Sequence, residues 1–236
     1  MASAFLCIGH RGARGHEPEN TVRSVRRALE LGADGVEVDA WFAGGELIVI
    51  HDETLDRTTN GRGRVADRTF AQLRALDAGG GEKIPTLREI FDAVDRRAFI
   101  NIELKGPATA APVQSLIEEY VNARGWSYGH FLVSSFDHTE LALLANPRLR
   151  IGLLYPRVPL RFAKLAAKLG AYSIHTPVRS TRRPFVARAH RLGLKVFTYT
   201  ANSPRSIKRL RAIGVDGVFT DFPERVSQKI CHSSLR

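Results

Sequence analysis

The stretch from Leu194 to Thr220 reads LKVFTYTANSPRSIKRLRAIGVDGVFT. It begins with an apolar run over Leu194–Tyr199, continues with a helix-like segment over Ser203–Ile213, and ends with a strand-like run over Asp216–Thr220. Ser203 is suited to cap the start of the helix, and Gly214 stands where a helix end favours a left-handed residue. The stretch therefore predicts a strand–helix–strand unit, the building block of a parallel sheet.

The same alternation extends in both directions along the chain. The other strand-like runs are Phe5–Gly9, Gly35–Asp39, Phe99–Leu104, His130–Ser134, Arg150–Leu154 and Ala171–His175. The other helix-like stretches are Thr21–Leu31, Thr86–Asp95, Thr109–Arg124, Asp137–Ala145, Leu160–Leu169, Arg182–Leu192 and Pro223–Ile230. Eight such units in succession predict an α/β fold, a closed (β/α)8 TIM barrel that residues 1–236 form as a single domain.

Helix boundaries in this pattern follow from the residues that flank it. Gly32, Gly170 and Gly193 come directly after predicted helices, as Gly214 does. Asn20 stands one position before a predicted helix and Asp137 at the start of another, where a side-chain oxygen can accept from the first free backbone N–H groups. We therefore expect both to be N-caps.

One strand-like run, Glu46–Ile50, is not needed for the eight units. Only Gly44-Gly45 separates it from the end of the second strand, and a two-residue glycine turn makes an antiparallel hairpin. Counting back across the turn pairs Ala43 with Glu46 and Ala40 with Val49, and returns His51 to the level of the second strand's polar residues. The Gly-, Arg- and Thr-rich residues 52–85 then form a small insertion on the rim, with a short helix near Phe70–Leu76.

Size and composition narrow the class of protein. At 236 residues and 44% hydrophobic composition, the chain can bury one sizeable core. The apolar residues 4–8 are too few for a signal peptide, and no stretch approaches the roughly 20 apolar residues of a membrane span. Cys7 and Cys231 provide no disulfide framework, so we expect a cytoplasmic protein.

Charge is distributed unevenly along the chain, whose formal net charge is +11. Between Leu141 and Val215 there is no Asp or Glu, while Lys and Arg number 16. One interpretation is a solvated surface; the other is a positive face that attracts anionic phosphates or makes weak peripheral contact with an anionic membrane. No nucleic-acid reader motif accompanies the charge, so we expect no nucleic acid partner. The sequence does not indicate an oligomeric state.

Charged and polar residues follow the first three strands of the predicted barrel. His10 and Arg11 end the first, Glu37 and Asp39 the second, and Glu103 and Lys105 the third. Active sites of such barrels lie at the carboxyl ends of the strands. Because side chains alternate along a strand, Glu37 and Asp39 lie on the same side of theirs, and so do Glu103 and Lys105.

Three carboxylates that face one another across a barrel mouth repel unless a cation lies between them. Ligation by oxygen alone favours a hard ion, so Glu37, Asp39 and Glu103 predict a site for Mg²⁺ or Ca²⁺, with Mn²⁺ as a further candidate. Such an ion would neutralise a substrate phosphate.

Each of these residues also has a simpler interpretation. Glu103 and Lys105 can form an ion pair alone, and Glu-x-Asp pairs are commonly solvated, although here the pair lies in an apolar strand where uncompensated burial is costly. His175 ends the sixth strand and is a weaker candidate for the mouth. The remaining histidines are interpreted as structural or surface residues: His16, His130, His138, His190 and His232.

Several ordered motifs resemble the glycerophosphodiester phosphodiesterase family, in its bacterial cytoplasmic type. They are His10-Arg11-Gly12, Pro18-Glu19-Asn20-Thr21, Glu37-x-Asp39, His51-Asp52, Arg57-Thr58-Thr59, Ile84-Pro85-Thr86-Leu87, Glu103-Leu104-Lys105, Ser135-Phe136 and Gly214–Asp221. The resemblance covers nearly the whole chain. It implies a metal-dependent barrel enzyme that cleaves glycerophosphodiesters to glycerol 3-phosphate and an alcohol.

The resemblance also implies roles for individual residues. Glu37, Asp39 and Glu103 would bind the metal, His10 and His51 would act as acid and base, and Arg11 and Lys105 would hold the phosphate. A histidine pair suits both proton transfers because its pKa lies near neutrality. The sequence does not say which histidine is the base.

One motif departs from the family pattern, and two other functions stay open. Where such enzymes often have Trp-Thr-Val-Asn, this chain has Phe197-Thr198-Tyr199-Thr200, with Asn202 two residues later, so contacts to the alcohol headgroup are not predicted. A lysophospholipase-D-like enzyme would need an apolar trough, for which the candidates are Trp41, Phe42 and Phe70. A non-catalytic barrel that binds anionic phosphates or lipids is the alternative from a different class.

Overall fold

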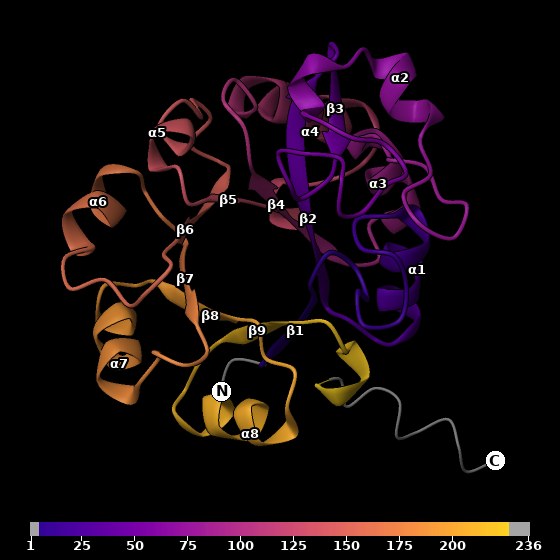
Figure 1. Ribbon diagram of the computed structural model, residues 1–236. Coiled ribbons are helices and arrows are strands. Elements are labelled where there is room, and N and C mark those ends of the chain that lie inside the picture. The colour runs from indigo at the N-terminus through magenta and orange to yellow at the C-terminus, as the bar shows by residue number, and fades with distance from the viewer. Residues whose placement is uncertain (1–4, 227–236) are drawn as a thin grey trace.

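A computed structural model describes residues 5–226, and its strands form a closed ring with helices outside (Figure 1). The strands are β1 (Leu6–Gly9), β2 (Gly35–Ala43), β3 (Glu46–Val49), β4 (Phe99–Leu104), β5 (Phe131–Ser135), β6 (Arg150–Leu154), β7 (Ser173–Pro177), β8 (Lys195–Tyr199) and β9 (Gly217–Thr220). All but β3 pair in parallel with their neighbours, and β1 closes the ring by pairing with both β2 and β9. The predicted eight-stranded barrel is confirmed.

The helices lie outside the ring and connect its strands (Figure 1). They are α1 (Val22–Glu30), α2 (Phe70–Ala75), α3 (Leu87–Val94), α4 (Ala110–Ala123), α5 (His138–Leu141), α6 (Ala163–Lys168), α7 (Arg183–Arg191) and α8 (Pro204–Ala212), with 3-10 turns η1 (Val65–Asp67), η2 (Tyr128–His130) and η3 (Pro223–Arg225). No helix within residues 5–226 is long and apolar enough to cross a membrane.

The extra strand β3 forms the predicted hairpin with β2. The two are antiparallel, and the register pairs Ala43 with Glu46 and Ala40 with Val49, as predicted. Beyond the hairpin, the short α2 occupies Phe70–Ala75, close to the predicted Phe70–Leu76. A small satellite core fastens this region to the hairpin; its buried members are Ala43, Ile48, Ile50, Leu55, Val65, Leu73 and Ile84.

Helix ends show which capping predictions were right. Gly32, Gly170, Gly193 and Gly214 all have positive φ, between 57° and 87°. Asp137 and Ser203 cap α5 and α8 by accepting from backbone N–H groups. The prediction for Asn20 is wrong, because Thr21 caps α1 by accepting from the Ser24 N–H at 3.1 Å. The side chain of Asn20 instead forms two hydrogen bonds with Asp39 of β2.

Three predicted helices differ from the structure in extent. The helix expected over Asp137–Ala145 ends at Leu141, because Leu143 and Leu144 donate to carbonyls three residues earlier and tighten the chain into turns. The helix expected over Leu160–Leu169 begins only at Ala163. Of the helix expected over Pro223–Ile230, the structure shows the turn η3, and the part beyond Val226 lies outside the described residues.

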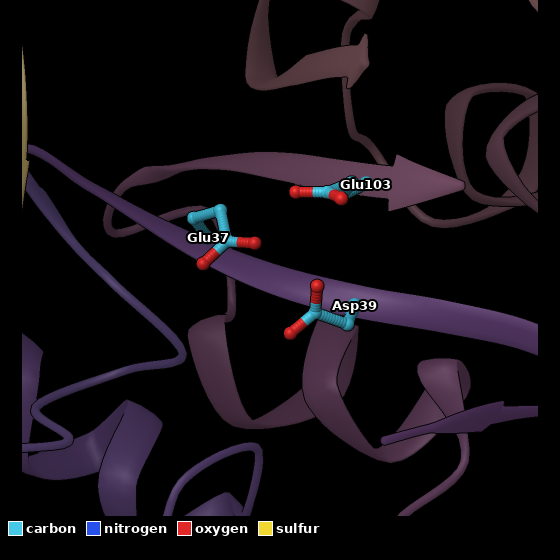
Figure 2. A group of neighbouring side chains, drawn as sticks. All are labelled: Glu37, Asp39 and Glu103. Atoms are coloured by element: carbon cyan, nitrogen blue, oxygen red, sulfur yellow. The ribbon is translucent and has the colours of Figure 1, made fainter. Parts of the chain in front are cut away.

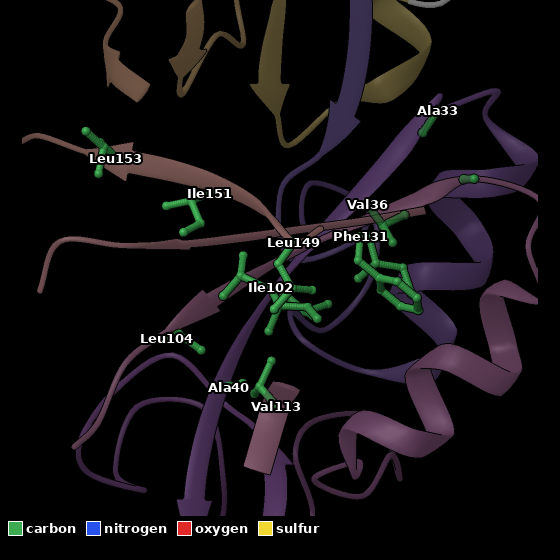
Figure 3. Packing of buried hydrophobic residues seen from close by; sticks show 14 of the residues in the cluster. Ala33, Val36, Ala40, Ile102, Leu104, Val113, Phe131, Leu149, Ile151 and Leu153 are labelled. Atoms are coloured by element: carbon green, nitrogen blue, oxygen red, sulfur yellow. The ribbon is translucent and has the colours of Figure 1, made fainter. Parts of the chain in front are cut away.

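Alternation along the strands separates the core from the barrel interior. Val36, Val38 and Ala40 of β2 belong to the large core between strands and helices, as do Ile100, Ile102 and Leu104 of β4. Figure 3 shows Val113 of α4 close to this layer. The residues between them, Glu37, Asp39, Asn101 and Glu103, point the other way. Ile8, Leu132, Phe197 and Phe219 form a small apolar cluster inside the ring.

Candidate active site

Three buried carboxyl groups converge at the carboxyl ends of β2 and β4. Parallel pairing sets Asp39 level with Glu103, and Glu37 lies two residues before Asp39 on the same face. One oxygen from each of the three lies within 4.8 Å of the others, and Figure 2 shows their carboxylates turned toward one another. Their exposed fractions are 3% for Glu37, 0% for Asp39 and 8% for Glu103.

Each carboxylate is held by a different neighbour. Glu37 accepts from the backbone N–H of Arg11 at 2.8 Å, and Asp39 Oδ2 accepts from Asn20 Nδ2 at 2.8 Å. Glu103 accepts from Lys105 Nζ at 2.7 Å, so the predicted alternative of an ion pair between these two is also present. Asp39 Oδ1 is buried and has no hydrogen-bond partner among the described residues.

These contacts do not compensate for the burial of three acids. Burial raises the pKa of Glu37 well above its usual range, and the Asp39 carboxylate adds to the effect. Burial also raises the pKa of Glu103 to about 7. A divalent cation fits this group, because the donors are all oxygen, the charges repel without it, and one buried oxygen is free to ligate. The chemistry of the donor set does not choose among Mg²⁺, Ca²⁺ and Mn²⁺.

His51 stands beside the acidic group with a defined tautomer. Its Nδ1 lies 2.6 Å from Asp52 Oδ1, and its Nε2 lies 3.2 Å from Lys105 Nζ. Because an ammonium group only donates, Nε2 must accept, which assigns the ring proton to Nδ1 and its hydrogen bond to Asp52. Burial lowers the pKa of His51, which favours this neutral form.

A chain of ion pairs supports Asp52 from behind. Arg57 donates to both of its oxygens, at 2.6 and 3.0 Å, and also to both oxygens of Glu19. Glu19 accepts from Arg11 Nη1 at 2.6 Å. Although burial acts to raise it, these arginines lower the pKa of Glu19 to about 2. His51 and Arg11 are therefore positioned by one continuous network.

His10 has its own supporting carboxylate, which the sequence analysis did not predict. Its Nδ1 lies 2.7 Å from Asp221 Oδ1, just after β9. Asn202 donates to the other oxygen of Asp221 at 2.7 Å and accepts from its backbone N–H at 2.9 Å. The signal was present, since Asp221 closes the Gly214–Asp221 motif at the end of the last strand.

The turn after β1 aims His10 and Arg11 at the site. Arg11 has a φ of 52°, and Gly12 follows with a φ of 81°. A Cβ on Gly12 would lie 2.5 Å from the backbone carbon of Ser24, so only glycine fits there. The guanidinium of Arg11 is buried and lies 3.4 Å from Asp39 Oδ2 through Nε.

A cavity of about 280 Å³ connects these groups at the barrel mouth. Its lining includes the charged or titratable residues His10, Arg11, Arg14, Glu37, His51 and Glu103, together with Asn101, Phe136, Leu154, His175, Tyr199, Thr200 and Phe219. The lining residues of β1, β2 and β4 and of the turns that follow are polar, and those from β5, β6, β8 and β9 are mainly apolar or aromatic.

His175 lines this cavity in its neutral form. It is fully buried, its Nε2 lies 2.8 Å from Ser173 Oγ, and burial lowers its pKa to about 3. The other histidines of the described chain contact groups elsewhere: His16 at Glu224, His130 at Ser127, His138 at the Leu154 carbonyl and His190 at Asp216. His232 lies outside the described residues.

The aromatic residues predicted for an apolar trough lie away from the cavity. Trp41 and Phe70 pack against the satellite core below the hairpin, and Phe42 is 41% exposed on the hairpin itself. None of the three is among the residues that line the cavity. Its apolar wall comes instead from Phe136 after β5, from Leu154 and Tyr199 at the ends of β6 and β8, and from Phe219 in β9.

The sequence of the chain matches the model of the glycerophosphoryl diester phosphodiesterase family over residues 10–225. The chain belongs to this family. A glycerophosphodiester phosphodiesterase of Caldanaerobacter subterraneus subsp. tengcongensis is 38% identical over 232 residues, which cover 93% of this chain and 95% of that one. As a member of the glycerophosphodiester phosphodiesterases, the protein is a phosphoric diester hydrolase.

Solved structures agree with this membership. A phosphodiesterase of Oleispira antarctica, in complex with the product sn-glycerol-3-phosphate, superposes with a TM-score of 0.85 at 28% identity and covers 93% of this chain and 94% of its own. A glycerophosphodiester phosphodiesterase of Agrobacterium tumefaciens superposes with a TM-score of 0.80 at 30% identity and covers 96% of this chain and 99% of its own.

Proposed function

We propose that this protein hydrolyses glycerophosphodiesters to glycerol 3-phosphate and an alcohol, with a divalent cation at Glu37, Asp39 and Glu103 and with His10 and His51 as the proton-transfer pair. The observation that carries the proposal is that both imidazoles have Nδ1 held by a carboxylate, at 2.7 and 2.6 Å, and line one cavity with the acidic group. The Oleispira relative with bound sn-glycerol-3-phosphate supports the product.

Separate groups of residues bind the cation, hold the phosphate and transfer protons. A cation, when bound, neutralises negative charge on the phosphate. In this proposal Arg11 and Lys105 hold the phosphate oxygens. The support is that both cations lie beside Asp39 of the acidic group and that Arg11 lines the cavity.

Proton transfer falls to the histidine pair. With each Nδ1 held by a carboxylate, proton exchange with substrate takes place at Nε2, and Lys105 Nζ, which donates to the Nε2 of His51 at 3.2 Å, gives up this hydrogen bond when it binds the phosphate. One histidine removes a proton from the attacking hydroxyl, and the other protonates the leaving alcohol. The hydroxyl belongs to water or to the glycerol C2; attack by the C2 hydroxyl forms a cyclic phosphate, which water then opens to glycerol 3-phosphate. Asp52 and Asp221 fix the two rings by hydrogen bonds and so act as positioning residues.

Two substrates with different leaving groups test the histidine pair and show which histidine is the acid and which is the base. With glycerophosphocholine, we expect His10→Ala and His51→Ala each to lower kcat by roughly 100-fold or more, the usual contribution of general acid–base catalysis. With a nitrophenyl ester of glycerol phosphate, the leaving group needs no proton, so the variant that lacks the acid should regain activity and the variant that lacks the base should not. Activity within tenfold of wild type in both variants on glycerophosphocholine would refute the proposal.

The apolar wall supports a second substrate class. Phe136 and Tyr199 meet edge to face at 6.0 Å, and Phe136 is 43% exposed at the mouth, beside Leu154. Such a wall suits a substrate that retains an acyl chain, as in a lysophospholipase-D-like reaction. Comparing the products from glycerophosphocholine and a lysophosphatidylcholine tests this directly. If Phe136→Ser lowers turnover of the lysophospholipid and spares glycerophosphocholine, the wall binds the chain; equal effects would contradict it.

A further inference from the structure

Three exposed large apolar side chains lie at the carboxyl end of the strands, the end that carries the cavity mouth. Within residues 5–226, the exposed large apolar side chains are Phe42 at 41%, Phe136 at 43%, Leu143 at 61%, Leu160 at 84% and Leu192 at 48%. Phe42 lies on the part of β2 beyond the barrel, Phe136 follows β5, and Leu160 follows β6, so all three are at the carboxyl end of the strands. Leu160 is the most exposed of them.

The loop between β6 and α6 holds Leu160 outward. On one side Val158 packs against the main core, and on the other Phe162 is 1% exposed and meets the Phe185 ring at 5.4 Å. Arg188 Nη1 of α7 donates to the Leu160 carbonyl at 3.0 Å. The backbone is therefore fastened at and around Leu160 while its side chain stays in solvent, where an apolar group is unfavourable.

Unpaired cations surround this leucine. Arg157 and Arg161 are exposed, and Lys164 is exposed in the first turn of α6. No ion pair within residues 5–226 includes either arginine, and the stretch from Leu141 to Val215 itself has no Asp or Glu. Around the β2–β3 side of the mouth the arginines are instead paired, as Arg57 is with Glu19 and Arg64 with Glu53.

We propose that the β6–α6 loop docks the protein peripherally on anionic phospholipid bilayers, with Leu160 among the acyl chains and Arg157 and Arg161 on the lipid phosphates. A fastened apolar tip between unpaired cations combines the two forces that hold peripheral proteins at such surfaces. A polyanion such as nucleic acid would use the arginines and leave the leucine without a role. The docking is independent of the hydrolytic mechanism.

Matched double variants test this proposal. Leu160→Ser/Arg161→Gln removes the tip, and Leu143→Ser/Arg148→Gln removes the same exposed residue types from the connection between α5 and β6, at the amino end of the strands. Sedimentation is measured with vesicles of phosphatidylcholine alone and of equal parts phosphatidylcholine and phosphatidylglycerol, at about 0.05 M salt, where exposed charges are weakly screened. Turnover of glycerophosphocholine is measured in parallel and should stay at wild-type level in both variants, since neither touches the cavity.

The expected losses of affinity for anionic vesicles follow from the contacts proposed for Leu160 and Arg161. An arginine at an anionic surface contributes about fivefold in binding and a newly buried leucine about tenfold, so Leu160→Ser/Arg161→Gln should bind anionic vesicles roughly 50-fold more weakly than wild type. The control variant should stay within about fivefold of wild type, the effect of its one lost charge. Wild-type protein that does not sediment with anionic vesicles, or equal binding by the two double variants, would overturn the proposal.

Discussion

Replacing Glu103 with Gln in metal-free protein should change how stability depends on pH. Folding raises the pKa of Glu103 from 4.5 to about 7, so the native state retains a proton that the unfolded chain has lost. The carboxyl group's favourable contribution is therefore complete below pH 4.5 and is lost as the pH rises through 7. The Glu103→Gln side chain has a similar shape and does not titrate.

The size of this effect follows from the shift. At about 1.36 kcal/mol per pKa unit, the Glu103 shift corresponds to roughly 3 kcal/mol, of which about 2.5 kcal/mol falls between pH 5 and pH 8. Between these pH values, the free energy of unfolding of the wild type should fall by that amount relative to Glu103→Gln. Titrations of groups remote from Glu103 cancel in this difference. Glu37 adds to it, because the Glu103 carboxylate helps to raise the pKa of Glu37 and Gln has no charge.

Urea unfolding in the presence of chelator, at pH 5, 6, 7 and 8, measures the free energies of unfolding of the wild type and of Glu103→Gln. Adding Mg²⁺ at pH 8 should then restore stability to the wild type and give little to Glu103→Gln, which has lost a ligand. Parallel pH profiles for the two metal-free proteins would refute the view that Glu103 is an uncompensated buried acid.

Two further predictions concern the histidines and their supports. His175 is buried and neutral with a pKa of about 3, so its contribution to stability is complete above pH 6.5 and is lost as the pH falls, by about 2 kcal/mol at pH 5. Urea unfolding of wild type and His175→Leu should therefore converge by about that amount between pH 7 and pH 5, and a constant difference would count against a neutral His175. Asp221→Asn should lower kcat by roughly 100-fold with KM within about threefold, because the ring of His10 loses its charged support. A change confined to KM in steady-state kinetics would mean that Asp221 serves substrate binding instead.

Much of the barrel follows from local patterns that the tertiary structure did not override. The two-residue turn at Gly44-Gly45 determined the hairpin register, and the alternation of Glu37 and Asp39 with valines in β2 decided which side chains face the mouth. Residues at strand ends are brought together by the closure of the barrel itself. The acidic group could therefore be located from three short motifs far apart in the sequence.

Other features depended on contacts that no local pattern contains. Asn20 and Thr21 are both good capping residues, and the choice between them was made by Asp39, which binds the Asn20 side chain. Asp221 and Asn202 lie on two different loops, so their pairing behind His10 is visible only once β8 and β9 are adjacent. The apolar wall was misplaced for a similar reason, because Trp41 packs under the hairpin of its own strand.

The helix boundaries show the same limit on a smaller scale. The periodicity before Ala163 continues back to Leu160, yet the burial of Phe162 and the hydrogen bond from Arg188 hold that segment as a loop. Its exposed tip is thus a product of tertiary contacts.

Turnover of glycerophosphocholine before chelation, after chelation and after Mg²⁺ is added back tests the central claim most directly. Because the three buried carboxylates leave phosphate charge uncompensated without a cation, metal-free protein should turn over at least about 100-fold more slowly. Circular dichroism recorded alongside should show a folded barrel throughout, since the core of strands and helices does not include the acidic group. Mg²⁺ should restore the rate. Undiminished turnover by the folded, metal-free protein would contradict the account.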